Sequence, residues 1–277
     1  MRFTKMHGAG NDYVYIDCMK GAPAHPEQLA ISMSDRHFGI GSDGLVLILP
    51  SQVADFRMRM FNADGSEAQM CGNASRCVGK YVYENGLTDK TEITLETKAG
   101  IKPMRLTVVD GKVSSVRVDM GEPVLEPIRI PVALSGERAV AVPLELSGAA
   151  FTMTCVSMGN PHAVVFVPRL DEVDVHKWGP IAECHPLFPE RCNIEFAEVL
   201  SPEEITMRVW ERGAGETLAC GTGACATLVA AVLNGLAGRS ARLRLLGGNL
   251  DITWSDDDNH VYMSGGAVTV FAGEWLL

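Results

Sequence analysis

Two cysteines in this sequence stand where chemistry could begin. Cys220 lies in "GETLACGTGACATLVAAVLNG", just before an apolar helical run, and Cys71 has the same place in "SEAQMCGNASRCVGKYVYENG". The backbone N–H groups of a first helical turn have no intrahelical partner. They stabilise a thiolate and lower its pKa, or they bind a carboxylate. We therefore expect two reactive thiols, each beside an anion-binding helix start.

The two segments are copies of each other. Cys220 follows Cys71 by 149 residues (220 − 71 = 149). The same offset relates further pairs without a gap: Glu67 and Glu216, Gly72 and Gly221, Asn85-Gly86 and Asn234-Gly235, and Gly10-Asn11 and Gly159-Asn160. Solenoid repeats are shorter, at roughly 20–50 residues. The sequence therefore predicts two related domains.

A pair of thiols at related helix starts suits a reaction that inverts a carbon centre. If the halves face each other across a cleft, Cys71 and Cys220 reach one carbon from opposite faces, so that one removes a proton and the other delivers one. The α-hydrogen of an amino acid is a weak acid, so donors must stabilise the charge that develops on its carboxylate. No lysine stands in an identifiable pyridoxal phosphate context. The pattern favours a racemase or epimerase without a cofactor.

Composition argues against several other classes of function. The net charge of −10 disfavours nucleic acid or an anionic membrane as a partner. We see no signal-peptide pattern and no apolar run of about 18 residues, and we expect a cytoplasmic protein. Neither Cys71/Cys77 nor Cys220/Cys225 has the C-x2-C spacing of zinc sites, so no metal is expected. Cysteines other than Cys71 and Cys220 are expected in the core: Cys18, Cys77, Cys155, Cys184, Cys192 and Cys225.

Strand-like alternation of apolar and polar residues dominates both halves, and "VDGKV" indicates a hairpin turn. Helices are expected at about 72–84 and 221–233, with shorter ones near 26–36 and 178–184. The helix in "TGACATLVAAVLNG" is apolar nearly all round, which predicts burial inside its domain. Glycine after each main helix fits a C-cap. The fold class is α+β, with strands wrapped about a helix in each half and a boundary near residues 121–123.

Six segments together resemble the diaminopimelate epimerase family: "FTKMHGAGNDYVYID", "NADGSEAQMCGN", "SMGNPHAVVF", "CNIEFAEV", "VWERGAGETLACGTGACA" and "VYMSGGAVTVFAGE". The resemblance covers nearly the whole chain. It implies two pseudo-symmetric β-rolls, each around a central helix, with the last strand returning to the first domain. The domains would be 1–120 with 266–277 and 121–265, with the active site in the cleft between them. It also implies epimerisation of LL-diaminopimelate to the meso form, in lysine and peptidoglycan-precursor synthesis, and a homodimer.

The resemblance also assigns residues. Cys71 and Cys220 match the family's acid and base. Amides that hold the reacting carboxylate match Gly72, Asn73, Gly221 and Thr222. Other substrate-binding positions match Asn11, Asn62, Asn160, Asn193, Glu211 and Arg212. Arg212 suits a second carboxylate, because its guanidinium can bind one in a bidentate way. His162 orients Asn160, lines the cleft, or is structural.

This chain departs from the family pattern at two places. Gly44 stands where many members have a substrate-binding glutamine, so no side-chain contact is assigned there, and the neighbouring Asp43 is expected to be structural. Ala74 replaces the commoner glycine of "CGNG", which leaves the chemistry in place.

Two other functions remain open at this stage. A proline or hydroxyproline racemase would have the same fold, but its small substrate has no distal end that needs Arg212 and Glu211. A thiol switch in which Cys71 and Cys220 form a reversible disulfide would leave the asparagines and Arg212 unexplained. The presence of Arg212 with Glu211, and of the asparagines, therefore favours diaminopimelate as the substrate.

Overall fold

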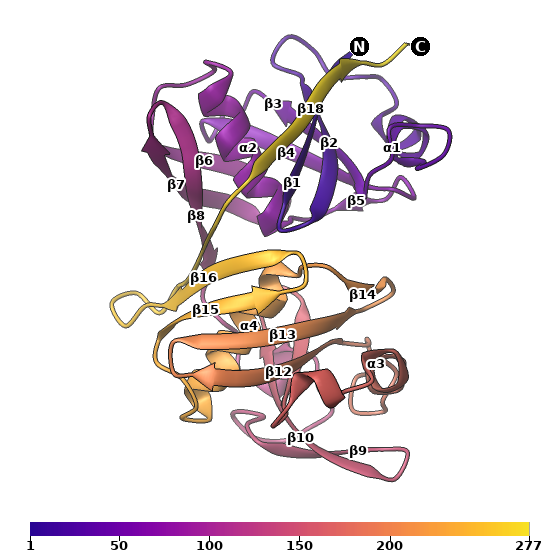
Figure 1. Ribbon diagram of the computed structural model, residues 1–277, viewed down its shortest axis with the longest axis vertical. Coiled ribbons are helices and arrows are strands. Elements are labelled where there is room, and N and C mark those ends of the chain that lie inside the picture. Colours follow the sequence, from indigo (N-terminus) through magenta and orange to yellow (C-terminus); the bar gives the residue numbers. More distant parts are fainter. Residues whose placement is uncertain (277) are drawn as a thin grey trace. The chain divides into compact units, whose positions relative to one another are not determined.

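The computed structural model describes residues 1–276, which form two compact units (Figure 1). Met1–Asp119 and the chain from Ser264 onward form unit 1, and Met120–Met263 form unit 2. The division expected from the sequence, after residues 120 and 265, falls one and two residues from these limits.

Unit 1 is a sheet rolled around one helix. Its strands are β1 (Arg2–Gly8), β2 (Asn11–Asp17), β3 (Gly44–Leu49), β4 (Phe56–Asn62), β5 (Glu67–Ala68), β6 (Glu92–Thr97), β7 (Gly100–Val109), β8 (Lys112–Gly121) and β18 (Val268–Glu274). The order is β18-β1-β2-β3-β4-β6-β7-β8, with β2–β3 and β4–β6 parallel and the other pairs antiparallel. Helix α2 (Gly72–Glu84) packs on β1, β2 and β7, and α1 (Pro26–Ser34) packs on β2, β3 and β4.

Unit 2 repeats this plan. Its strands are β9 (Val142–Leu146), β10 (Ala149–Ser157), β11 (Pro161–Phe166), β12 (Asn193–Ser201), β13 (Glu204–Glu211), β14 (Gly215–Thr217), β15 (Ser240–Leu245), β16 (Gly248–Trp254) and β17 (Val261–Gly265), the last of which ends in unit 1. The order β10-β11-β12-β13-β15-β16 has the same alternation of antiparallel and parallel pairs as β1-β2-β3-β4-β6-β7. Two short 3-10 helices (Pro127–Arg129 and Leu170–Glu172) and α3 (Val175–Glu183) complete the unit.

The central helix of unit 2, α4 (Gly221–Leu233), contacts β10, β11, β12, β15 and β16. Its apolar residues are buried on nearly every side, as their pattern predicts. Both main helices begin and end at the residues expected. Each is followed by an asparagine C-cap and then a glycine, and Gly86 and Gly235 both have a φ of 69°, which a glycine adopts without steric cost. The duplication predicted from the sequence is therefore present in the pairing of the strands and in the two helices.

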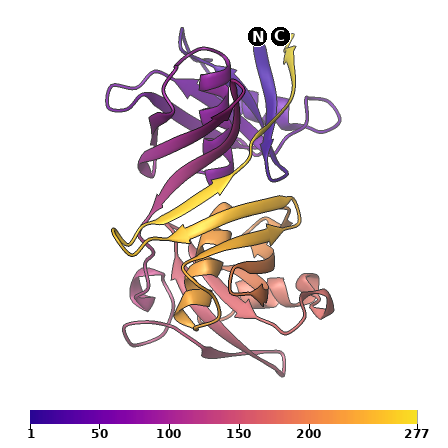
Figure 2. The ribbon, with the colours of Figure 1, turned by 60° about the vertical axis from the view of Figure 1, so that its left-hand side comes forward.

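The last strand returns to the first unit. β18 pairs antiparallel with β1, and Trp275 N donates to Met1 O at 2.7 Å. Figure 2 shows the two ends of the chain beside each other as a result.

The structure confirms the predicted hairpin and corrects two helix boundaries and the burial of one cysteine. The hairpin at "VDGKV" joins β7 to β8 through Asp110 and Gly111, which both have positive φ. Helix α3 begins at Val175 and not at Trp178, because Asp174 caps it by accepting from Lys177 N. Helix α1 ends at Ser34, short of Arg36. Cys184 was expected in the core and is exposed, since it follows the last residue of α3.

None of the helices within residues 1–276 is long and apolar enough to cross a membrane.

Candidate active site

In unit 1, Cys71 and Asn11 lie together. Cys71 is the N-cap of α2 and has an extended backbone, with φ −139° and ψ 121°. Its Sγ donates to Asn11 Oδ1 at 3.3 Å, and Asn73 Nδ2 donates to the same oxygen at 3.4 Å. Asn11 begins β2, next to the end of β1. Three residues assigned from the sequence are therefore joined at one amide oxygen.

Asp43 holds the other end of the Asn11 amide. Asn11 Nδ2 donates to Asp43 Oδ2 at 2.8 Å, and Asp12 N donates to that oxygen at 3.1 Å. Arg36 Nη2 donates to Asp43 Oδ1 and to Asp12 Oδ1, both at 3.0 Å. Burial and the nearby charge of Asp12 raise the pKa of Asp43, and the bonds from Asp12 N and Asn11 partly offset this. Asp43 has a structural role, as expected, and this role is to hold Asn11 in the candidate site.

The remaining positions of unit 1 lie on neighbouring strands. Asn62 ends β4, and its Nδ2 donates to Ser66 Oγ at 3.0 Å, so this side chain is engaged in the turn that follows. Gly44 pairs with Asn62 in register. A Cβ added at Gly44 would lie 2.0 Å from Phe61 O, so this backbone does not admit a side chain at position 44.

In unit 2, Cys220 is the N-cap of α4. Gly223 N donates to its Sγ at 3.4 Å, and the Thr222 hydroxyl lies 3.4 Å from the same atom. The first turn of the helix therefore presents donors to the sulfur, as the sequence predicts. The expectation of a lowered pKa is wrong for this thiol. Burial, and then the negative charges of Glu211 and Glu195, raise the pKa of Cys220 well above its ordinary value.

Glu211 and Arg212 follow each other at the end of β13. Glu211 Oε1 accepts a hydrogen bond from the Thr217 hydroxyl. Burial raises the pKa of Glu211, and its hydrogen bonds with Thr217 and Cys220 oppose that rise. Arg212 is exposed; its backbone N donates to Asn193 Oδ1 at 2.8 Å, and its Nη1 donates to Glu190 O at 3.0 Å.

His162 links Asn160 to a carboxylate that the sequence analysis missed. His162 Nε2 lies 3.1 Å from Asn160 Oδ1, and His162 Nδ1 lies 2.6 Å from Glu195 Oε1. The side chains of His162 and Glu195 are both 0% exposed. The sequence does contain a signal for Glu195, since it is a single acid within the apolar strand "CNIEF". A buried carboxylate is costly unless it has a partner, so this pattern predicts one.

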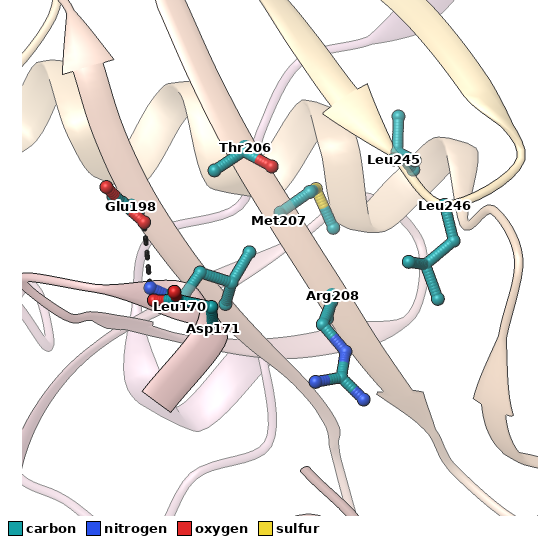
Figure 3. A pocket seen from close by; sticks show the side chains of 8 residues that line it. All are labelled: Leu170, Asp171, Glu198, Thr206, Met207, Arg208, Leu245 and Leu246. Carbon is teal, nitrogen blue, oxygen red and sulfur yellow. Dashed lines mark hydrogen bonds between the residues drawn. The ribbon is translucent and has the colours of Figure 1, made fainter. Parts of the chain in front are cut away.

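One further feature of unit 2 is a shallow surface pocket of about 310 Å³ (Figure 3). It is lined by Leu170, Asp171, Glu198, Thr206, Met207, Arg208, Leu245 and Leu246. None of these residues was assigned to the site, so the pocket is separate from the residues described above.

Solved structures of other proteins share this fold. A probable proline racemase from Agrobacterium radiobacter K84 superposes with a TM-score of 0.74 and 17% identity, over 100% of this chain and 93% of that one. A phenazine biosynthesis protein of the PhzF family from Bacillus anthracis gives 0.72 and 19%, over 100% and 99%. At these identities the likeness shows the fold alone, which is the double β-roll.

Sequence comparison is more specific. The family model described as diaminopimelate epimerase matches residues 3–126 and 154–270. A diaminopimelate epimerase from Acetivibrio thermocellus is 61% identical over 274 residues, which cover 99% of this chain and 98% of that protein. The chain belongs to the diaminopimelate epimerase family.

Proposed function

We propose that this protein epimerises LL-diaminopimelate to the meso form without a cofactor, as a step of lysine and peptidoglycan-precursor synthesis. The observation that carries the proposal is the repeat-related placement of Cys71 and Cys220, each at the N-cap of a central helix, in a chain of this family.

In the proposed reaction, one cysteine acts as a thiolate and takes the α-proton, so the Cα–H bond breaks and an S–H bond forms. The electron pair left on Cα delocalises into the α-carboxylate. The backbone amides of Gly72, Asn73, Gly221 and Thr222 would stabilise that charge. The thiol of the other cysteine then gives its proton to the opposite face of Cα. For the reverse reaction the two cysteines exchange roles.

The other assigned residues would hold the distal amino-acid group of diaminopimelate. Arg212 would bind its carboxylate, and Glu211 with Asn11, Asn62, Asn160 and Asn193 would bind its remaining polar groups. An arginine beside a glutamate suits a substrate with a second zwitterionic end, which proline lacks.

One assay tests this proposal against its alternatives. Dialysed protein treated with a chelator is incubated with LL-diaminopimelate in D2O, and we expect formation of the meso isomer with deuterium at Cα. If diaminopimelate is inert and proline exchanges its α-hydrogen, the protein is a racemase of the proline type. If both are inert and oxidant joins Cys71 to Cys220, it is a thiol switch.

We also propose that the protein works in the cytoplasm as a homodimer. All eight cysteines are free thiols, which suits a reducing compartment. On β18, Val268, Val270 and Phe271 are 48%, 53% and 46% exposed, and such a patch on a strand suits contact with a second copy. Sedimentation of the wild type and of a Val270→Lys variant would test the dimer, since the charged side chain should favour monomers.

A further inference from the structure

The two asparagines related by the repeat, Asn11 and Asn160, are held in opposite orientations. In unit 1 the Asn11 NH2 group faces Asp43, and its oxygen faces Cys71 and Asn73. In unit 2 the Asn160 oxygen faces His162, so its NH2 group is turned away from the ring. One amide therefore presents an acceptor, and its counterpart presents a donor.

The orientation of Asn11 follows from the chemistry of its partner. An ionised carboxylate only accepts hydrogen bonds, so Asp43 Oδ2 can face the NH2 group of Asn11 and not its oxygen. Arg36 and the Asp12 N–H hold this carboxylate in place. Asn11 Oδ1 is thus the atom left to meet the Cys71 thiol.

The orientation of Asn160 is set through His162. Glu195 Oε1 lies 2.6 Å from His162 Nδ1, and the pair is fully enclosed. His162 Nε2 faces Asn160 Oδ1, and an amide oxygen only accepts hydrogen bonds, so the ring is the donor in this contact.

Glu195 is held in place on two sides. Besides His162, its Oε1 lies close to the first turn of α4, where a Cβ added at Gly223 would be 2.6 Å from it. Its Oε2 is buried and has no hydrogen-bond partner among the residues described. A carboxylate that is buried at such a cost, and packed against both His162 and the Cys220 turn, is suited to fixing the site.

We infer that Asp43 and Glu195 are positioning residues: Asp43 fixes Asn11 as an acceptor toward the Cys71 thiol, and Glu195, through His162, fixes Asn160 as a donor toward the substrate. This inference rests on the proposed function, and it assigns roles within it. An acceptor suits an ammonium group or a thiol, and a donor suits a carboxylate.

Amide hydrogen exchange tests the orientations directly and without turnover. In protein labelled with 15N-asparagine, the side-chain NH2 signals are assigned by their loss in Asn11→Asp and Asn160→Asp. We expect slow exchange with solvent for Asn11, whose NH2 group is bonded to Asp43, and fast exchange for Asn160. Equal protection of the two NH2 groups in the wild type would overturn the inference, even if the protein is a fully active epimerase.

Kinetics of Glu195→Gln then test the role of the buried carboxylate. An amide at this position can either donate to His162 Nδ1 or accept from it, so it no longer fixes which ring nitrogen faces Asn160 as a donor, and Asn160 is free to turn. We expect KM to rise roughly tenfold, the value of one hydrogen bond to a charged group, with a smaller change in kcat. Asp43→Asn should weaken binding in the same way through Asn11.

Glu198→Gln is the matched control. Glu198 lies three residues further along β12, and its carboxylate accepts from Leu170 N at 2.8 Å, in the pocket of Figure 3. It touches no asparagine of the site, so KM should stay at the wild-type value. If Glu195→Gln and Glu198→Gln have the same KM while the wild type epimerises diaminopimelate, the inference fails and the proposed function stands.

Discussion

The Sγ atom of Cys220 accepts a hydrogen bond from Gly223 N at 3.4 Å, at the start of α4. This donor favours the thiolate, yet burial and the charges of Glu211 and Glu195 outweigh it and raise the pKa of the thiol. The ionisation of Cys220 is therefore sensitive to the carboxylates around it.

Glu211→Gln removes one of those charges and should lower the pKa of Cys220. The rate of alkylation of Cys220 by iodoacetamide is followed by peptide mass spectrometry between pH 7 and 11, and it should rise at a lower pH than in the wild type. The Glu198→Gln variant should keep the wild-type profile. An unshifted profile in Glu211→Gln would mean that this carboxylate does not control the thiol.

Cys71→Ala and Cys220→Ala should each abolish epimerisation and leave the fold intact. Each face of the carbon has a single proton carrier in the proposed mechanism, and a positioned acid or base contributes roughly 10²–10⁴-fold to the rate. Circular dichroism and unfolding midpoints check the fold, and formation of the meso isomer measures turnover. Near-normal turnover by either variant would contradict the two-base mechanism.

Arg212→Met should weaken the binding of diaminopimelate by about 2–5 kcal/mol, because a substrate carboxylate would lose its charged partner. The fold should tolerate the change, since the side chain is exposed and the bond from Asn193 goes to the backbone N of Arg212. The measurement is the rise in unfolding temperature that the substrate produces. Arg242→Met, at an exposed ion pair with Asp251, is the control. Equal protection in all three proteins would remove Arg212 as the anchor.

Much of the fold was predictable because it is local or repeated. The periodicity of apolar residues located α2 and α4 to the residue, and a constant offset of 149 between Cys71 and Cys220 predicted the duplication. The start of α3 was expected at Trp178, where its apolar pattern begins. The helix starts earlier because its capping residue, Asp174, lies one turn before that pattern.

The partners within the site were less predictable, because they join residues far apart in the sequence. Asp43 meets Asn11 across 32 positions, and Glu195 meets His162 across 33, through strands whose register no short motif encodes. The pKa of Cys220 was wrongly anticipated for the same reason. The helix start that lowers it is local, whereas the burial and the two carboxylates that raise it come from the packing of β12 and β13.

The buried thiols should make the fold sensitive to alkali. Burial, with a smaller effect of the Glu195 charge, raises the pKa of Cys155 to about 12. In the unfolded chain a cysteine thiol has a pKa of about 8.5. Above that lower value the unfolded chain releases a proton that the folded protein keeps. The free energy of unfolding therefore falls as pH rises, by about 1.4 kcal/mol per pH unit for this thiol, until the pH reaches the folded pKa.

Cys155→Ala should remove this part of the pH dependence. Between pH 8 and 10 we expect its free energy of unfolding in urea to fall by roughly 2 kcal/mol less than that of the wild type. Comparing each protein with itself at the two pH values cancels the cost of the cavity left by the smaller side chain. Cys184→Ala, which removes an exposed thiol, is the control. If Cys155→Ala and the wild type lose equal stability over this range, burial does not hold Cys155 protonated in the folded protein.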